Sequence, residues 1–181
     1  PGPILWAGAT PIYADCENDF TINPTDLVRK ISSRTKAIVV QHTFGQPARL
    51  EEILKIARER NLIVIEDCAH ALGGFAEMGG VTQPLGSFGD AAFFSFGRDK
   101  SISSVFGGGI AVRSPELHQK IAALVNEYEM PSPLWIIQQL MHPLVLAKAK
   151  ATYNFLSIGK PLRTINSRYK DLHPFSKSQG M

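Results

Sequence analysis

The sequence has 181 residues, which is enough for about 1.2 average domains and so for one hydrophobic core with an appendage. Apolar residues make up 44% and charged residues 19% of the chain, which excludes wholesale disorder. The sequence contains no run of about 18 uncharged apolar residues, which argues against a standard membrane span. The net charge of +3 is uneven, because residues 148–177 hold seven Lys or Arg and one acid, whereas the other residues, with 12 basic and 15 acidic side chains, carry −3. The basic excess therefore belongs to a tail and not to a nucleic-acid-binding face of the main body.

The cysteine content and the first residues bear on the cellular compartment. Cys16 and Cys68 are too few for a disulfide framework, so a reducing cytoplasm is the expected location. No Cys/His spacing is typical of a metal site, and we predict no metal. The chain starts at Pro1 without an initiator Met or a secretory leader, as if within a domain.

The first predicted helix begins after Asn23, a favourable N-cap, with Pro24 at the first helical position. Leu27, Val28 and Ile31 would give this helix its buried side.

A βαβ unit comes next in the chain. Residues 37–40 and 62–65 are continuous apolar runs, as in parallel strands that are covered on both faces. Between them, apolar residues recur at the helical spacing i, i+3, i+4, i+7, namely Leu50, Ile53, Leu54 and Ala57.

Residues 73–89, with six glycines and a proline, suggest loops, and residues 91–94 and 109–112 suggest two further strands. Ser114 then caps another helix, whose apolar face would hold Leu117, Ile121, Leu124 and Val125. Alternating strands and helices predict an α/β fold, a three-layer αβα arrangement around a mostly parallel sheet.

The composition changes after residue 129. Prolines punctuate an apolar segment at 134–147, and the basic stretch comes after it. We expect a C-terminal helical segment that packs on the same chain or on a partner subunit, because amphipathic helices usually pack on protein. A membrane-surface helix is the alternative.

Side chains that could carry chemistry come after three of the predicted strands. The segment 66–70, Glu-Asp-Cys-Ala-His, directly follows the predicted strand at 62–65. Acidic residues at the carboxyl end of a parallel strand lie at the ligand-binding edge of an open α/β sheet. The alternative role for Asp67 is to cap the next turn. Residues 95–101 follow the strand at 91–94. A loop lysine is usually a solvated charge, but the glycines at 107–109 would let backbone pass close to a ligand. For residues 42–47 we favour a positioning role over direct chemistry.

An acid, a histidine, a serine and a lysine therefore reach one edge of one sheet. This set suits pyridoxal phosphate (PLP), which needs a lysine to hold its aldehyde, a carboxylate against its ring nitrogen and donors for its phosphate.

The motifs together resemble those of the DegT/DnrJ/StrS sugar aminotransferases, PLP enzymes of the aspartate aminotransferase fold (fold type I). The resemblance runs from about Ile4 to Val125 and rests on residues 45–47, 66–70, 86–90, 94–96, 100 and 107–109. It implies an enzyme that transfers an amino group from an amino acid, glutamate or glutamine, to a keto group of a nucleotide-linked sugar. The pathway would be cell-surface polysaccharide or secondary-metabolite biosynthesis, and the full-length protein would be a homodimer.

The resemblance also implies roles for four residues. Lys100 would bind the cofactor and then shuttle protons between the substrate carbon and the cofactor carbon. Asp67 would pair with the pyridine nitrogen, and His70 would lie close to the ring and its phenolic oxygen. Ser95 would bind the phosphate.

Several features depart from the family pattern. Val105-Phe106 replaces the usual glycine-glutamate after the lysine segment, residues 74–84 form a longer loop than usual, and the proline-rich segment 131–143 is not a general family feature. We find neither the glycine-rich phosphate-binding segment nor the C-terminal small domain. We therefore expect residues 1–128 to form a partial PLP-binding large domain, and residues 129–181 to form a helical, basic extension that leads toward a small domain.

Two alternatives to the aminotransferase stay open. A PLP-dependent sugar dehydratase would keep the fold and the cofactor, but related dehydratases carry a histidine at the lysine position, and Lys100 argues against this interpretation. The second alternative is a catalytically inactive, truncated chain that acts as a binding or assembly module. The segments of the family that we do not find in this sequence favour it. Neither a nucleic acid nor a membrane is an expected partner.

Overall fold

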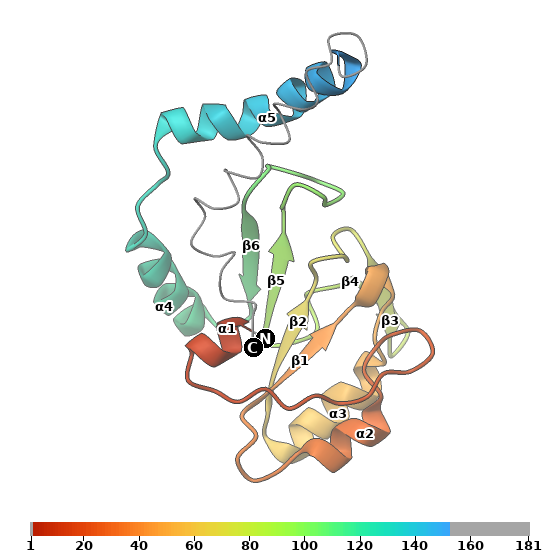
Figure 1. Cartoon of the computed structure of the whole chain (residues 1–181). Coiled ribbons are helices and arrows are strands. Elements are labelled where there is room, and N and C mark those ends of the chain that lie inside the picture. Colours follow the sequence, from red (N-terminus) through yellow and green to blue (C-terminus); the bar gives the residue numbers. More distant parts are fainter. Residues whose placement is uncertain (1, 153–181) are drawn as a thin grey trace. The chain divides into compact units, whose positions relative to one another are not determined.

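The computed structural model describes residues 2–152, and the chain divides into two compact units, Pro1–Glu129 and Met130–Met181. The first unit contains the sheet and most of the helices (Figure 1). Its helices are α1 (Gly2–Trp6), α2 (Pro24–Lys30), the 3-10 turn η1 (Thr43–Gly45), α3 (Leu50–Arg60) and α4 (Pro115–Asn126). Its strands are β1 (Ala37–Gln41), β2 (Ile63–Asp67), β3 (Phe75–Met78), β4 (Val81–Pro84), β5 (Ala91–Ser95) and β6 (Gly108–Val112).

The main sheet has four strands in the order β1-β2-β5-β6. Strands β1, β2 and β5 run parallel, and β6 pairs antiparallel with β5. The carboxyl ends of β1, β2 and β5 therefore meet at one edge of the sheet, which is where open α/β sheets bind ligands. The prediction of a mostly parallel sheet is confirmed.

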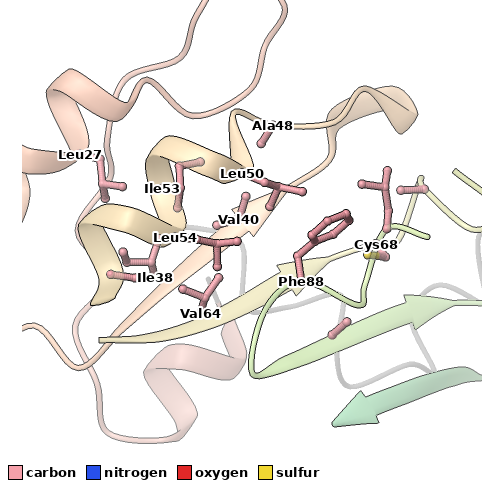
Figure 2. Packing of buried hydrophobic residues seen from close by; sticks show 14 residues of the cluster. Leu27, Ile38, Val40, Ala48, Leu50, Ile53, Leu54, Val64, Cys68 and Phe88 are labelled. Atoms are coloured by element: carbon pink, nitrogen blue, oxygen red, sulfur yellow. The ribbon is translucent and has the colours of Figure 1, made fainter. Parts of the chain in front are cut away.

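One side of this sheet, which we call its first face, carries the hydrophobic core. Ile38, Val40 and Val64 point from β1 and β2 toward α3, and Leu27 of α2 joins them (Figure 2). The predicted stripe of α3 is confirmed, since all four of its members are buried: Leu50, Ile53, Leu54 and Ala57.

The helix starts also agree with the sequence. The side chain of Asn23 accepts a hydrogen bond from the N–H of Asp26, and Ser114 accepts one from the N–H of Leu117. These bonds satisfy N–H groups that a helix leaves without partners in its first turn.

The opposite, second face of the sheet is only partly covered. Helix α4 contacts β6, and Phe93 and Ile110 line a groove beside it, so helices lie on both faces of the sheet. Val39 of β1 is 40% exposed and Ile63 of β2 is 52% exposed. The expectation that both faces of these two strands are covered is therefore wrong for residues 2–152, because no described helix packs over that side of β1 and β2.

Residues 73–89 are not simply loops. Strands β3 and β4 form an antiparallel hairpin, and Gly79 and Gly80, both at positive φ, make its two-residue turn. A Gly-Gly pair between two short strands is a recognised hairpin signal, and the glycine content of this region concealed it.

The described part of the second unit is α5 (Pro133–Thr152), which agrees with the predicted helical segment. Pro143 lies inside this helix and removes one backbone hydrogen-bond donor. Among the described residues, no helix is long and apolar enough to span a membrane. Most of the predicted basic tail lies at 153–181, outside the described residues.

Candidate active site

Asp67 is the last residue of β2, paired with Gln41 on one side and with Phe93 on the other. It is half-buried, and its side chain belongs to the second face, opposite Glu66. Its Oδ1 accepts a hydrogen bond of 3.0 Å from the N–H of Ala69, so the capping interaction considered from the sequence is present. A carboxylate offers about four acceptor positions, and one such bond leaves capacity for a ligand.

Ser95 and Lys100 lie together around Gly97. Ser95 ends β5, and its Oγ accepts a 3.4 Å hydrogen bond from the N–H of Gly97. The N–H of Lys100 donates to the carbonyl of Gly97 at 3.1 Å. A Cβ added at Gly97 would lie 3.5 Å from the Oγ of Ser95 and 4.0 Å from the Cγ of Lys100. The glycine therefore leaves open the space between the hydroxyl and the lysine stem.

Pairing of the strands connects these residues to Asp67. Because Asp67 is opposite Phe93 and Ser95 is two residues further along β5, Asp67 and Ser95 share the second face of the sheet. The structure thus brings a carboxylate, a hydroxyl and an amine to the same edge.

His70 follows Asp67 by three residues and is exposed. Its ring stacks on that of Phe44, with the centroids 5.9 Å apart and an interplanar angle of 5°. Phe44 in turn meets Phe20 edge to face, with the centroids 6.3 Å apart. Phe44 was not singled out from the sequence, although its backbone at φ 54° is unusual for a residue other than glycine. The contact fixes one side of the imidazole ring.

Directly beneath the edge, Glu66 and His42 form a fully buried pair. The N–H of Ala48 donates to Nδ1 of His42 at 3.2 Å, which leaves the ring proton on Nε2, from where it is donated to Oε2 of Glu66 at 3.0 Å. The backbone N–H of His42 also donates to the carbonyl of Asp67 at 3.1 Å. His42 therefore holds the end of β2 at two points, which supports its predicted positioning role.

Glu66 also anchors the loop that precedes β5. Its carboxylate accepts hydrogen bonds from the N–H groups of Gly86, Phe88 and Gly89 at 2.8, 2.8 and 2.7 Å. Burial raises the pKa of Glu66, but the bonds from His42 and from these backbone groups outweigh burial, and the net pKa lies below its ordinary value. Glu66 therefore binds the loop in its ionised, carboxylate form.

Arg113 holds the same loop from its carbonyl side. Its guanidinium donates to the carbonyl oxygens of Ser87, Phe88 and Gly89 at 2.6, 3.2 and 3.3 Å. The family motif at 86–90 thus acts as a structural brace next to the site, and sequence reasoning did not identify Arg113.

One cluster among the described residues has the composition of a metal site. Ligand atoms of His42, Glu66 and Cys68 lie within 4.8 Å of one another, all of them buried. Both imidazole nitrogens and both carboxylate oxygens already have hydrogen-bond partners within the protein. Burial, followed by the charges of Glu66 and Asp67, raises the pKa of the Cys68 thiol to about 12, whereas metals bind the thiolate. We therefore assign this cluster a structural role.

The α/β fold of the first unit is similar to that of solved aminotransferases. The PseC aminotransferase of Helicobacter pylori, involved in the biosynthesis of pseudoaminic acid, matches with a TM-score of 0.62 and 32% identity over 67% of this chain and 32% of that chain. DesI, solved in the presence of its TDP-sugar product, matches with a TM-score of 0.64 and 35% identity over 70% of this chain and 31% of that chain.

Sequence comparison gives the family. Residues 2–129 match the model of the DegT/DnrJ/EryC1/StrS aminotransferase family, and the chain belongs to that family. A GDP-perosamine synthase of Escherichia coli O157:H7 is 38% identical over 118 residues, which are 65% of this chain and 31% of that protein. The chain thus spans about a third of the length of the relatives it matches.

Proposed function

We propose that this chain contributes the lysine-bearing part of a PLP-dependent aminotransferase. The amino donor would be glutamate or glutamine, and the acceptor would be a keto group of a nucleotide-linked sugar. The proposal is supported above all by one observation: Asp67 and Ser95 end neighbouring parallel strands on the same face, with Lys100 beside Ser95 around Gly97. Family membership and relatives that act on nucleotide sugars add to it.

The donor set fits the cofactor. PLP carries an aldehyde, a ring nitrogen that needs an anion when protonated, and a phosphate that needs hydrogen-bond donors. The residues at this edge supply an amine, a carboxylate and a hydroxyl, and the open space at Gly97 leaves room between two of them. When bound, the cofactor serves as an electron sink for the carbon that loses a proton.

Each residue would then have a separate task. Lys100 would hold the cofactor through Nζ and carry the proton between carbon atoms. Asp67 would keep the ring nitrogen protonated by a charge-assisted hydrogen bond, worth roughly 1.5–3 kcal/mol. Ser95 would donate its hydroxyl to the phosphate. His70, held against Phe44, would lie beside the ring.

We also propose that the whole protein works as a homodimer in the cytoplasm, in polysaccharide or secondary-metabolite biosynthesis. The relatives' names support the pathway class: one is a spore coat polysaccharide biosynthesis protein of Bacillus subtilis, 38% identical over 122 residues.

The test is reduction of the purified chain with borohydride in the presence of PLP, followed by peptide mapping by mass spectrometry. We expect the pyridoxyl mass on Lys100, and we expect it to disappear in Lys100→Arg. Lys120→Arg, on the exposed side of α4, is the matched control and should keep the adduct. An adduct scattered over surface lysines, or none, would reject the proposal for this chain and favour the inactive binding or assembly module.

Asp67→Asn adds a second readout. Binding of PLP should persist, but the absorbance of the bound cofactor should change, because the neutral amide no longer stabilises a protonated ring nitrogen. In the complete enzyme, turnover should be largely lost. An unchanged spectrum together with near-normal turnover would refute the role of Asp67.

A further inference from the structure

Two exposed phenylalanines beside the candidate site have strained backbones. Among residues 2–152, four residues other than glycine have positive φ, and two of them, Phe20 (64°) and Phe44 (54°), contact each other edge to face. A bulky side chain in this region of the backbone is uncommon and costs free energy. Burial does not compensate for that cost, because Phe20 and Phe44 remain 64% and 75% exposed. Core packing therefore does not explain why these two conformations occur.

Hydrogen bonds hold both backbones in place. The hydroxyl of Thr43 donates to the carbonyl oxygen of Phe20 at 2.9 Å, which joins η1 to the loop before α2. The N–H of Gly45 donates to the carbonyl of the buried His42 at 3.1 Å, which closes the turn around Phe44. The surrounding bonds therefore determine where the ring of Phe44 lies.

The turn η1 approaches His70 at two points. The ring of Phe44 stacks on the imidazole, with the centroids 5.9 Å apart. At the backbone, a Cβ added at Gly45 would lie 3.3 Å from the carbonyl oxygen of His70, so glycine lets the two segments come close. On the other segment, the carboxylate of Asp67 holds the N–H of Ala69, one residue before His70. Both backbones are thus fixed, and the ring contact is left to orient the imidazole.

We propose that Phe44, supported by Phe20, is a positioning residue that holds the imidazole ring of His70 in one orientation. An exposed histidine otherwise exchanges between staggered rotamers within nanoseconds. A stacked aromatic pair favours one arrangement by a factor of about 2–10 beyond the burial of its area. The consequence for the cofactor rests on the proposed function, in which His70 lies beside the PLP ring. Only the oriented fraction of the chain would then present the imidazole to the cofactor.

The stack requires a flat side chain at position 44. The rings of Phe44 and His70 are parallel to within 5°, so one face of the imidazole lies against the aromatic ring. Leucine can make an apolar contact but has no ring face on which the imidazole could stack. Tyrosine keeps the ring, so Phe44→Tyr should preserve the orientation that Phe44→Leu releases.

The first experiment measures the orientation of His70 by NMR in the 181-residue chain without cofactor, labelled with ¹³C-histidine. The ring current of Phe44 shifts the signals of the His70 ring protons, and His70→Gln identifies these signals by their loss. Phe44→Leu should move them toward the values of an unstructured histidine, whereas Phe44→Tyr should leave them nearly in place. Phe75→Leu, which replaces a similarly exposed phenylalanine of β3, is the matched control and should not move them.

A second variant tests the support. Phe20→Leu leaves the stack but removes the edge-to-face contact, so it should move the His70 signals in the same direction as Phe44→Leu and by less. Circular dichroism checks that each variant is folded, which we expect because both phenylalanines are largely exposed. The proposal is overturned if the His70 signals are the same in Phe44→Leu as in the parent chain.

The dissociation constant for PLP, measured from the absorbance of the bound cofactor, tests the consequence for the site. Phe44→Leu should raise the apparent Kd by up to about tenfold, and Phe44→Tyr should restore it. If Phe44 acts through His70, Phe44→Leu should have no further effect in the His70→Gln background. An equal effect in both backgrounds would overturn the proposal. Failure of the parent chain to bind PLP would instead refute the proposed function, and the NMR comparison would still decide whether Phe44 orients His70.

Discussion

Replacement of Glu66 by glutamine is the most informative test of the buried network. The carboxylate accepts four hydrogen bonds, two at each oxygen, from His42 and from three backbone N–H groups. In Glu66→Gln an NH₂ group, which can only donate, replaces one of the two carboxylate oxygens. The two donors that were bonded to that oxygen then lose their acceptor and face the donor NH₂ group. Each unsatisfied buried donor costs about 1–3 kcal/mol, and two such donors cost about twice as much. We therefore expect a loss of about 2–6 kcal/mol.

The assay is equilibrium denaturation by urea, followed by circular dichroism, with Glu59→Gln as the control. Glu59 is exposed on α3, so its replacement should change the free energy of unfolding by less than about 0.5 kcal/mol. If Glu66→Gln unfolds within about 0.5 kcal/mol of the parent chain, the carboxylate is not the brace that its contacts indicate.

The same geometry gives three further predictions. The pKa of Glu66 is lowered from its ordinary value of 4.5, so the stability that the ionised carboxylate contributes should be complete above pH 4.5 and should decrease as the pH falls through the lowered pKa. Denaturation curves measured over this pH range should show the decrease in the parent chain but not in Glu66→Gln. At pH 8, iodoacetamide should modify exposed Cys16 but spare Cys68, whose pKa of about 12 and burial keep it a protected thiol, as peptide mapping can check; rapid labelling of Cys68 would contradict its burial. Val105 has φ 70°, so Val105→Gly should raise stability by about 1 kcal/mol, seen as a higher Tm, and an unchanged Tm would argue against strain there.

Val105 belongs to a segment in which this sequence departs from the expected family pattern. Val105-Phe106 occupies the place of a usual glycine-glutamate, and a β-branched residue at positive φ is a genuine outlier. The loop thus has, at Val105, a backbone conformation that suits glycine. The sequence revealed the substitution, but only the backbone shows its conformational cost.

Local features were predictable because they depend on neighbours in the chain. The N-caps at Asn23 and Ser114 form hydrogen bonds with residues only three positions further along the chain. The buried stripe of α3 requires only the helical period. The strand-end position of Asp67 could be inferred from an apolar run that stops at an acid. Sequence reasoning failed for the hairpin β3–β4, where glycine-rich composition outweighed a two-residue turn signal.

The sequence by itself determined the α/β class, the buried stripe of α3 and the order in which Asp67, Ser95 and Lys100 follow their strands. It could not show that Glu66 and Asp67, adjacent in the chain, serve opposite faces, one as a buried brace and the other at the site. That division depends on β2 having neighbours on both sides and on which face α3 covers. Likewise, Arg113 joins the loop at 86–89 from 24–26 residues away, and such contacts exist only once the strands have paired.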